Sequence, residues 1–114
     1  MENKDNTVFL RHILDCIGKI ERYLTGFDLE KYQQDERTSD AVVRNVEIIG
    51  EAANNLTREF RSNTPNIEWR KIIATRNRII HGYATVDLEI IWSVTQNDLP
   101  ILKTEIEKIL ENLS

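Results

Sequence analysis

The sequence is poor in the residues that build disulfides and loops. Its 114 residues include one cysteine, two prolines and four glycines. A single cysteine cannot form an intramolecular disulfide, which favours a reducing compartment, and we expect a cytoplasmic protein. Scarce glycine and proline argue against an all-β protein with many turns. The composition therefore favours long regular elements.

Long uncharged apolar runs and a secretion signal are also missing. No run approaches the roughly 20 apolar residues that span a bilayer. The first residues, Met-Glu-Asn-Lys-Asp, lack the basic start and apolar stretch of a signal peptide. We expect a soluble protein without a membrane partner.

Positive charge is in deficit, because 15 Lys and Arg residues stand against 19 Asp and Glu residues. Proteins that coat nucleic acid by bulk electrostatics usually carry a basic face, so any RNA contact of this protein must be local. Between Ile67 and Tyr83 the only acid is Glu68. The cationic residues of this basic island are Arg70, Lys71, Arg76 and Arg78. A solvated helix face with mixed charges would look the same.

Apolar residues recur at spacings of three and four, which predicts amphipathic helices. The periodic segments cover about residues 5–25, 40–61, 65–82 and 87–113, and residues 28–34 form a connection with a helical turn. One core suits a chain of this length. The sequence therefore predicts an all-α fold, an up-and-down antiparallel four-helix bundle, formed by residues 1–114 as a single domain.

Capping residues predict where these helices begin and end. Gly26 is the expected left-handed residue after the first helix, Pro65 the first residue of the third, and Gly82 its end. Pro100 removes a backbone hydrogen bond and should kink the last helix. The candidate N-terminal caps are Asp5 or Asn6, then Asp35, Thr38 or Ser39, then Thr64, then Thr85 or Asp87, and Asn97 or Asp98 after the kink.

Several positions on the apolar stripes bear on packing and function. Cys16 is expected to be a packed small hydrophobe and not a nucleophile. Gly50, Ala52 and Ala53 form a thin section that lets a neighbouring helix approach closely. Arg76 lies on the core-facing line of the third helix, where an arginine is costly to bury unless it is paired or opens into a cleft. Arg76 is thus the first indication of a site.

The stretch from Arg76 to Tyr83 contains the groups needed to cleave a phosphodiester without a metal. His81 can remove the proton from a ribose 2′-OH or protonate the departing 5′-oxygen, and Arg76 can stabilise charge on the phosphorus oxygens. Asn77 could orient the His81 ring, and Tyr83 could stack on a base or bind a phosphate. On a regular helix Arg76 and His81 point about 140° apart. Either the helix ends near His81, or a second copy of the chain completes the site.

Neither a metal nor a cofactor is expected. The chain has two histidines, no His-x₃-His pair and no tight carboxylate cluster beside His81. From the residues alone, a plain helix end in which a cationic His81 favours the helix dipole explains the stretch at least as well as catalysis does.

The motif Arg76-Asn77-x₃-His81-x-Tyr83 resembles the R-x₄-H-x-Y motif of HepT-type toxins in the HEPN superfamily. Gly82 departs from that family's pattern, since many relatives carry an acid there. The likeness extends from about Asn6 to Leu113. Further similar features are Arg44 with Gly50-Glu51-Ala52, Trp69 with Ile72 and Ala74, and Trp92 with Leu99-Pro100.

The resemblance implies a metal-independent endoribonuclease that works as a homodimer, with the two motifs lining a shared cleft. It also implies the toxin of a type VII-like toxin–antitoxin system, whose cognate MntA-type minimal nucleotidyltransferase uses ATP to add AMP to Tyr83. The added phosphate would pair with Arg76 and repel RNA. The alternatives are a non-catalytic helical partner of a nucleotidyltransferase and a dimerisation bundle without a ligand. Extra apolar residues in the third and fourth helices, at 79–80 and 90–92, independently favour a dimer.

Overall fold

The structure, a computed structural model, describes residues 2–81 and 86–113, with side chains for residues 6–79 and 86–113. All regular structure within these residues is helical. Three long helices, α1 (Glu2–Tyr23), α3 (Glu36–Asn54) and α5 (Trp69–His81), precede a continuous run of α6 (Leu88–Ser93), the π-helical turn η1 (Val94–Asp98) and α7 (Leu99–Leu113). Two short helices, α2 (Leu29–Gln34) and α4 (Arg58–Ser62), lie between them.

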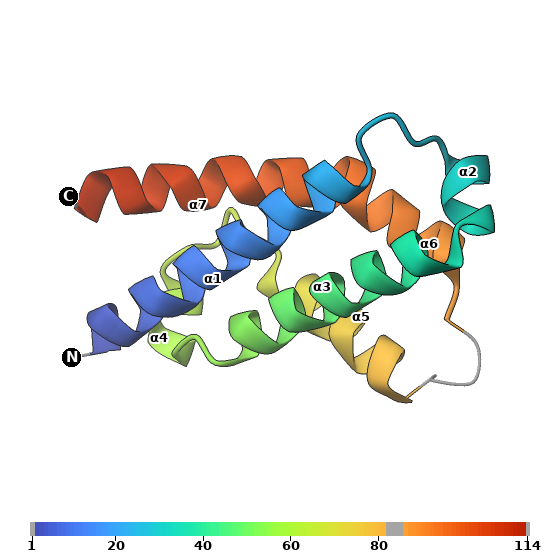
Figure 1. Cartoon of the computed structure of the whole chain (residues 1–114). Coiled ribbons are helices and arrows are strands. Elements are labelled where there is room, and N and C mark those ends of the chain that lie inside the picture. The colour runs from blue at the N-terminus through green and yellow to red at the C-terminus, as the bar shows by residue number, and fades with distance from the viewer. Residues whose placement is uncertain (1, 82–85, 114) are drawn as a thin grey trace.

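Successive long elements run in opposite directions, so the predicted up-and-down antiparallel bundle is confirmed (Figure 1). Helix α3 packs between α1 and α5, and α7 lies along α1. Helix α1 starts and α7 ends at the same end of the bundle, where α4 also lies (Figure 1). None of the helices in the described residues is long and apolar enough to cross a membrane.

The core forms where the apolar stripes of these helices meet. Each fully buried Leu, Ile or Val contributes roughly 1.5–3 kcal/mol, so these side chains dominate the stability of the fold. Cys16 is among them at 2% exposure, which confirms a packed residue, and its burial raises the pKa of its thiol. Core residues with 2% exposure or less include Leu10, Ile13, Ile17, Ile20, Val42, Ile49, Ala53, Leu56, Ile91 and Ile106.

Several predicted caps are confirmed. The Asp35 carboxylate accepts a hydrogen bond from the Thr38 amide at 3.0 Å and begins α3. Asp87 accepts from the amides of Glu89 and Ile90 and begins α6. Gly26 has a φ of 80°, the left-handed conformation that ends the first helix. Gly82 and Thr85 lie outside the described residues.

Asn6 is not a helix cap, because α1 already begins at Glu2. Its buried side chain instead reaches the start of α4. The Asn6 Oδ1 atom accepts from the Thr57 amide at 3.1 Å, and Nδ2 donates to Thr57 Oγ1 at 3.2 Å. Asn6 therefore fastens α4 to α1 across 51 residues of sequence.

The predicted helix over residues 40–61 is wrong at its end. Helix α3 stops at Asn54, and α4 is a separate turn whose first amides are capped by Thr57, which accepts from the Phe60 amide at 3.1 Å. The third long helix begins at Trp69 and not at Pro65, which lies in the preceding turn. Thr64 does not cap it, because its hydroxyl accepts a hydrogen bond from Trp69 Nε1 at 2.8 Å.

The predicted disturbance at Pro100 takes the form of a π-helical turn. The run from α6 to α7 bends there without interruption (Figure 1), which confirms the kinked last helix. Asn97 and Asp98 do not cap a second helix. Asn97 donates to the Ser93 hydroxyl at 3.1 Å, and Asp98 forms an ion pair with Lys71 at 3.3 Å.

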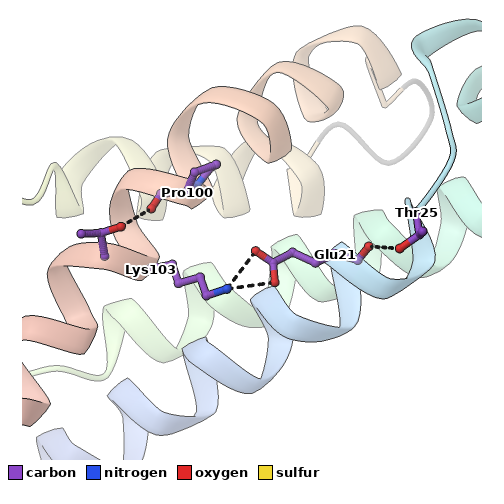
Figure 2. Close-up of polar contacts among 5 residues, drawn as sticks. Glu21, Thr25, Pro100 and Lys103 are labelled. Atoms are coloured by element: carbon purple, nitrogen blue, oxygen red, sulfur yellow. Dashed lines mark hydrogen bonds and ion pairs between the residues drawn. The ribbon is translucent and has the colours of Figure 1, made fainter.

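An ion pair aligns the last helix with the first. Figure 2 shows Lys103 of α7 pointing at Glu21 of α1, with Nζ 3.1 Å from Oε1 and 3.2 Å from Oε2. Both side chains are substantially exposed, so the pair contributes at most about 1 kcal/mol. The Pro100 carbonyl, in the first turn of α7, accepts from the Thr104 hydroxyl at 3.1 Å (Figure 2).

Tyr32 of α2 is fully buried, and its ring packs on Trp92 with centroids 5.3 Å apart. Its hydroxyl has no hydrogen-bond partner among the described residues. Burial, with a smaller effect from the charge of Asp40, raises the pKa of this phenol to about 12. Tyr32 therefore stabilises the fold through its ring and not through its hydroxyl.

We predict that Tyr32→Phe leaves the free energy of unfolding unchanged or raises it by about 1 kcal/mol, because an unpaired buried hydroxyl is removed. The unfolded phenol ionises near pH 10 and the folded one near pH 12, so the wild type loses stability as pH rises through this window. The variant should lack this loss. Urea titrations at pH 8 and pH 11 measure both effects, with the exposed Tyr23→Phe as control. A variant destabilised at pH 8 would contradict the prediction.

Candidate functional site

The close contact between Gly50 of α3 and Arg76 of α5 defines the site. A Cβ atom added to Gly50 would lie 2.9 Å from Arg76 Cγ and 3.2 Å from the Ile72 carbonyl oxygen, and it would overlap Arg76 Cβ. The aliphatic stem of Arg76 thus fills the place of a side chain at Gly50. This confirms that the thin section of α3 admits a neighbouring helix.

Arg76 is half-buried on the α3-facing side of α5. Its Nη1 atom donates to Asn77 Oδ1 at 3.0 Å, and its buried Nε has no hydrogen-bond partner among the described residues. No described carboxylate forms an ion pair with it. A guanidinium with spare donors and no internal anion is suited to bind a phosphate.

Asn77 holds the guanidinium of Arg76 through its carbonyl oxygen. The sequence had predicted a different task, the orientation of His81. The amide nitrogen of Asn77 has no partner among the described residues, so it is still free to donate. The contact with Arg76 adds a support that the sequence did not reveal, since adjacent residues on a helix do not normally face each other.

His81 is the last residue of α5, so the backbone is helical at both Arg76 and His81. Positions five apart on a helix point about 140° away from each other. The helix does end at His81, as the first of the two predicted alternatives requires. The side chain of His81 and all of Gly82 and Tyr83 lie outside the described part of the structure, and the roles predicted for His81 and Tyr83 stay predictions.

The cationic residues of the basic island have different surroundings in the structure. Lys71 is neutralised by Asp98 at 3.3 Å, whereas the exposed Arg70 and Arg78 form no ion pair with a described residue. No group of three or more His, Cys, Asp and Glu residues within the described chain is arranged to hold a metal ion.

Sequence reasoning missed two further arginines. Arg58 and Arg61 of α4 line an open groove of about 610 Å³ together with Arg70 and Asn77 of α5. They were assigned to the end of a long helix, where they would be ordinary surface charges. The signal that could have separated them is Asn54-Asn55-Leu56-Thr57, a pair of poor helix formers followed by a good N-terminal cap.

An apolar cavity of about 380 Å³ lies on the other flank of α5, between α3, α5 and α7. Its walls include Ile49, Ile72, Leu99 and Leu102, and the ion pair of Lys71 with Asp98 lies at its edge. Acidic and apolar walls do not suit a phosphate. The groove, and not this cavity, is lined by further arginines that can bind a phosphate as Arg76 can.

Comparison with known proteins shows to which family this chain belongs. The model of the HepT-like family, described as "Ribonuclease HepT-like", matches residues 13–109, so this chain belongs to that family. It is 36% identical over 101 residues to "Probable ribonuclease HepT" of Thermococcus cleftensis, covering 89% of this chain and 92% of the relative. It is 38% identical over 104 residues to "Putative RNase TTE0752" of Caldanaerobacter subterraneus subsp. tengcongensis, covering 90% and 92%.

Another relative is longer. The chain is 41% identical over 110 residues to "Gamma-glutamylcyclotransferase and putative RNase MJ0434" of Methanocaldococcus jannaschii. The match covers 96% of this chain but spans half the length of that relative. No solved structure matches the chain significantly. The resemblance to HepT-type proteins that rested on Arg76, His81 and Tyr83 is thus confirmed at the level of the family.

We predict opposite effects for two alanine substitutions. Gly50→Ala should lower the free energy of unfolding by about 1–3 kcal/mol, because the new methyl group overlaps Arg76 and pushes α3 and α5 apart. Gly18→Ala is the matched control, since its new Cβ would lie 3.7 Å from the nearest atom, Arg22 Nη1. It should raise that free energy by about 0.5–1 kcal/mol. Urea titrations measure both, and equal effects of the two substitutions would refute a tight contact at Gly50.

Proposed function

We propose that this protein is a metal-independent endoribonuclease, the toxin of a toxin–antitoxin system, acting on RNA in the cytoplasm. Membership of the HepT-like ribonuclease family is the observation that carries the proposal. The half-buried guanidinium of Arg76 supports it, because it forms no ion pair with a described residue and its buried Nε has no hydrogen-bond partner among them, which suits it to bind phosphate. Arg76 and His81 are the proposed catalytic residues, with Asn77 and Tyr83 in support.

The reaction is a transfer within the RNA strand. A ribose 2′-oxygen attacks the adjacent phosphorus and loses its proton to His81, while the bond from phosphorus to the 5′-oxygen breaks. The departing oxygen takes up a proton, from the same histidine or from a second copy of it. Arg76 stabilises the negative charge that builds on the non-bridging oxygens. The products are a 2′,3′-cyclic phosphate and a 5′-hydroxyl, and no step requires a metal.

A homodimer is part of the proposal. A helical backbone at both Arg76 and His81 supports a site that a second chain completes across a two-fold axis. Of the apolar residues predicted to favour a dimer, Ile79 and Ile91 are instead buried in the core of the chain, whereas Ile90 is 37% exposed. Together with Ile101, which is 63% exposed, Ile90 also supports association. In the shared cleft, two copies of His81 could divide the roles of base and acid.

Control by AMP transfer is the second part of the proposal. The Tyr83 oxygen would attack the α-phosphorus of ATP, the bond to the β-phosphate oxygen would break, and pyrophosphate would leave. The phenolic proton would go to a base of the cognate MntA-type nucleotidyltransferase. The attached phosphate would lie seven residues from Arg76 and compete with RNA for its guanidinium.

We predict that His81→Ala lowers kcat/KM for RNA cleavage by about 10²- to 10⁴-fold, the usual contribution of a general acid or base. His12→Ala is the control, because the only other histidine is exposed on α1. Wild-type activity should persist in EDTA. The assay follows a 5′-labelled RNA on a denaturing gel with protein that was never exposed to the nucleotidyltransferase.

The same variants separate catalysis from a non-catalytic partner role. If the protein only binds a nucleotidyltransferase, pure wild type cleaves no RNA, and its expression slows bacterial growth no more than His81→Ala does. Activity that disappears in EDTA would contradict the metal-independent reaction while leaving ribonuclease function intact.

We predict that Tyr83→Phe prevents AMP addition. Wild type and Tyr23→Phe, incubated with the cognate nucleotidyltransferase and ATP, should gain the mass of AMP and lose ribonuclease activity. Tyr83→Phe should gain no mass, because the attacking oxygen is missing, and incubation should not lower the ribonuclease activity that this variant had beforehand. Intact-protein mass spectrometry measures the change. An AMP adduct on Tyr83→Phe would contradict the prediction, because it would show that another residue is modified.

A further inference from the structure

We propose that the groove between α4 and the first half of α5 binds the phosphates of an RNA strand, with Arg58, Arg61 and Arg70 as the contacts. This inference rests on the proposed ribonuclease function and names the part of the protein that holds the substrate beside the cleavage site. Among the described side chains of the motif, only Asn77 lines the groove.

Two consecutive helices, α4 and α5, bring the arginines together. Arg58 and Arg61 are three apart on α4, so they share one face of that short helix, and Arg70 lies in the first turn of α5 opposite them. The three side chains line the same open space of about 610 Å³. A depression of this size and openness admits an extended strand and does not enclose a small molecule.

The charges of the groove are uncompensated. Arg58, Arg61 and Arg70 form no ion pair with a described residue, and Glu68 is the one acid among the described residues that line the groove. Lys71, which is also on α5 but points to the other flank, is neutralised by Asp98. In a protein with an overall charge of −4, this local excess of positive charge favours a polyanion.

The groove is built to recognise phosphates and not bases. Trp69, its largest aromatic residue, is only 4% exposed, because its ring packs on Phe60 with centroids 6.2 Å apart. The indole nitrogen of Trp69 is occupied by Thr64 at 2.8 Å. No aromatic face is therefore presented for stacking by the described residues of the groove. Contacts to phosphates position a strand without reading its sequence.

The register of α5 connects the groove to the catalytic motif. Arg70 and Asn77 are seven residues apart, which places them about 20° apart around the helix and roughly 10 Å apart along it. Position 81 follows one turn later, about 40° from position 77. Asn77 lines the groove and also accepts the hydrogen bond from Arg76. A strand bound along the arginines thus leads directly to the residues proposed to cleave it.

The test measures RNA binding as a function of salt. In a His81→Ala background, which separates binding from cleavage, the variant Arg58→Gln/Arg61→Gln/Arg70→Gln is compared with the unmodified background by fluorescence anisotropy. The probe is a fluorescein-labelled single-stranded RNA of mixed sequence in increasing KCl. Loss of three phosphate contacts should reduce the slope of log K against log salt by about 2, and weaken binding roughly tenfold at low salt.

Two further variants control for charge and folding. Arg11→Gln/Arg22→Gln/Arg37→Gln changes the net charge equally at exposed positions that do not line the groove, and should leave the slope nearly unchanged. Arg58→Lys/Arg61→Lys/Arg70→Lys keeps the charge and should keep most of the slope. With His81 present, the glutamine variant should raise KM and leave kcat unchanged, as expected for loss of uniform binding.

The outcomes separate this inference from the proposed function. If the groove and control variants change the slope equally, the groove does not bind RNA, and cleavage by the wild type still supports the ribonuclease. If the groove variant alone loses binding but His81→Ala cleaves RNA normally, RNA binding by the groove is supported. The catalytic role of His81 is then contradicted. A wild type that neither binds nor cleaves RNA overturns both.

Discussion

The contact of Gly50 with Arg76 is the constraint on which the site depends. A glycine inside a helix costs about 1 kcal/mol relative to alanine, and an arginine on a core-facing stripe loses hydration. Here one contact reduces both costs, because the aliphatic stem of Arg76 packs in the space that a side chain at Gly50 would fill. The guanidinium then reaches Asn77 at the edge of the helix pair. The packing that holds α3 against α5 thus also places the guanidinium of Arg76 at the edge of the core.

Helix α5 serves different purposes around its circumference. One side packs on α3 through Ile72 and Arg76, one flank borders the apolar cavity shared with α7, and the opposite flank carries Arg70 and Asn77 into the basic groove. In the proposed mode of binding, this separation lets an acidic protein contact RNA locally. Lys71 illustrates the division, because the ion pair with Asp98 ties its charge to the flank that faces α7.

The groove depends in turn on a buried amide of α1, the side chain of Asn6. Helix α4 has five residues, too few to be stable without packing. Asn6 of α1 holds the start of α4 by two hydrogen bonds to Thr57, and Asn6 is only 3% exposed, so water competes little for them. The position of Arg58 and Arg61 therefore follows from a contact between residues that are 51 apart in the chain.

The sequence by itself determined the order of the long helical segments and the motif, because periodicity, caps such as Asp35 and Asp87, and the spacing of Arg76 and His81 are local properties of the chain. Only the tertiary structure decided what meets across helices. The groove joins α4 to α5, and Asn6 caps nothing in α1 but binds the turn before α4. Local patterns extend over one or two helical turns, whereas the convergence of distant side chains depends on how closely the helices approach, and this is fixed by packing at positions such as Gly50.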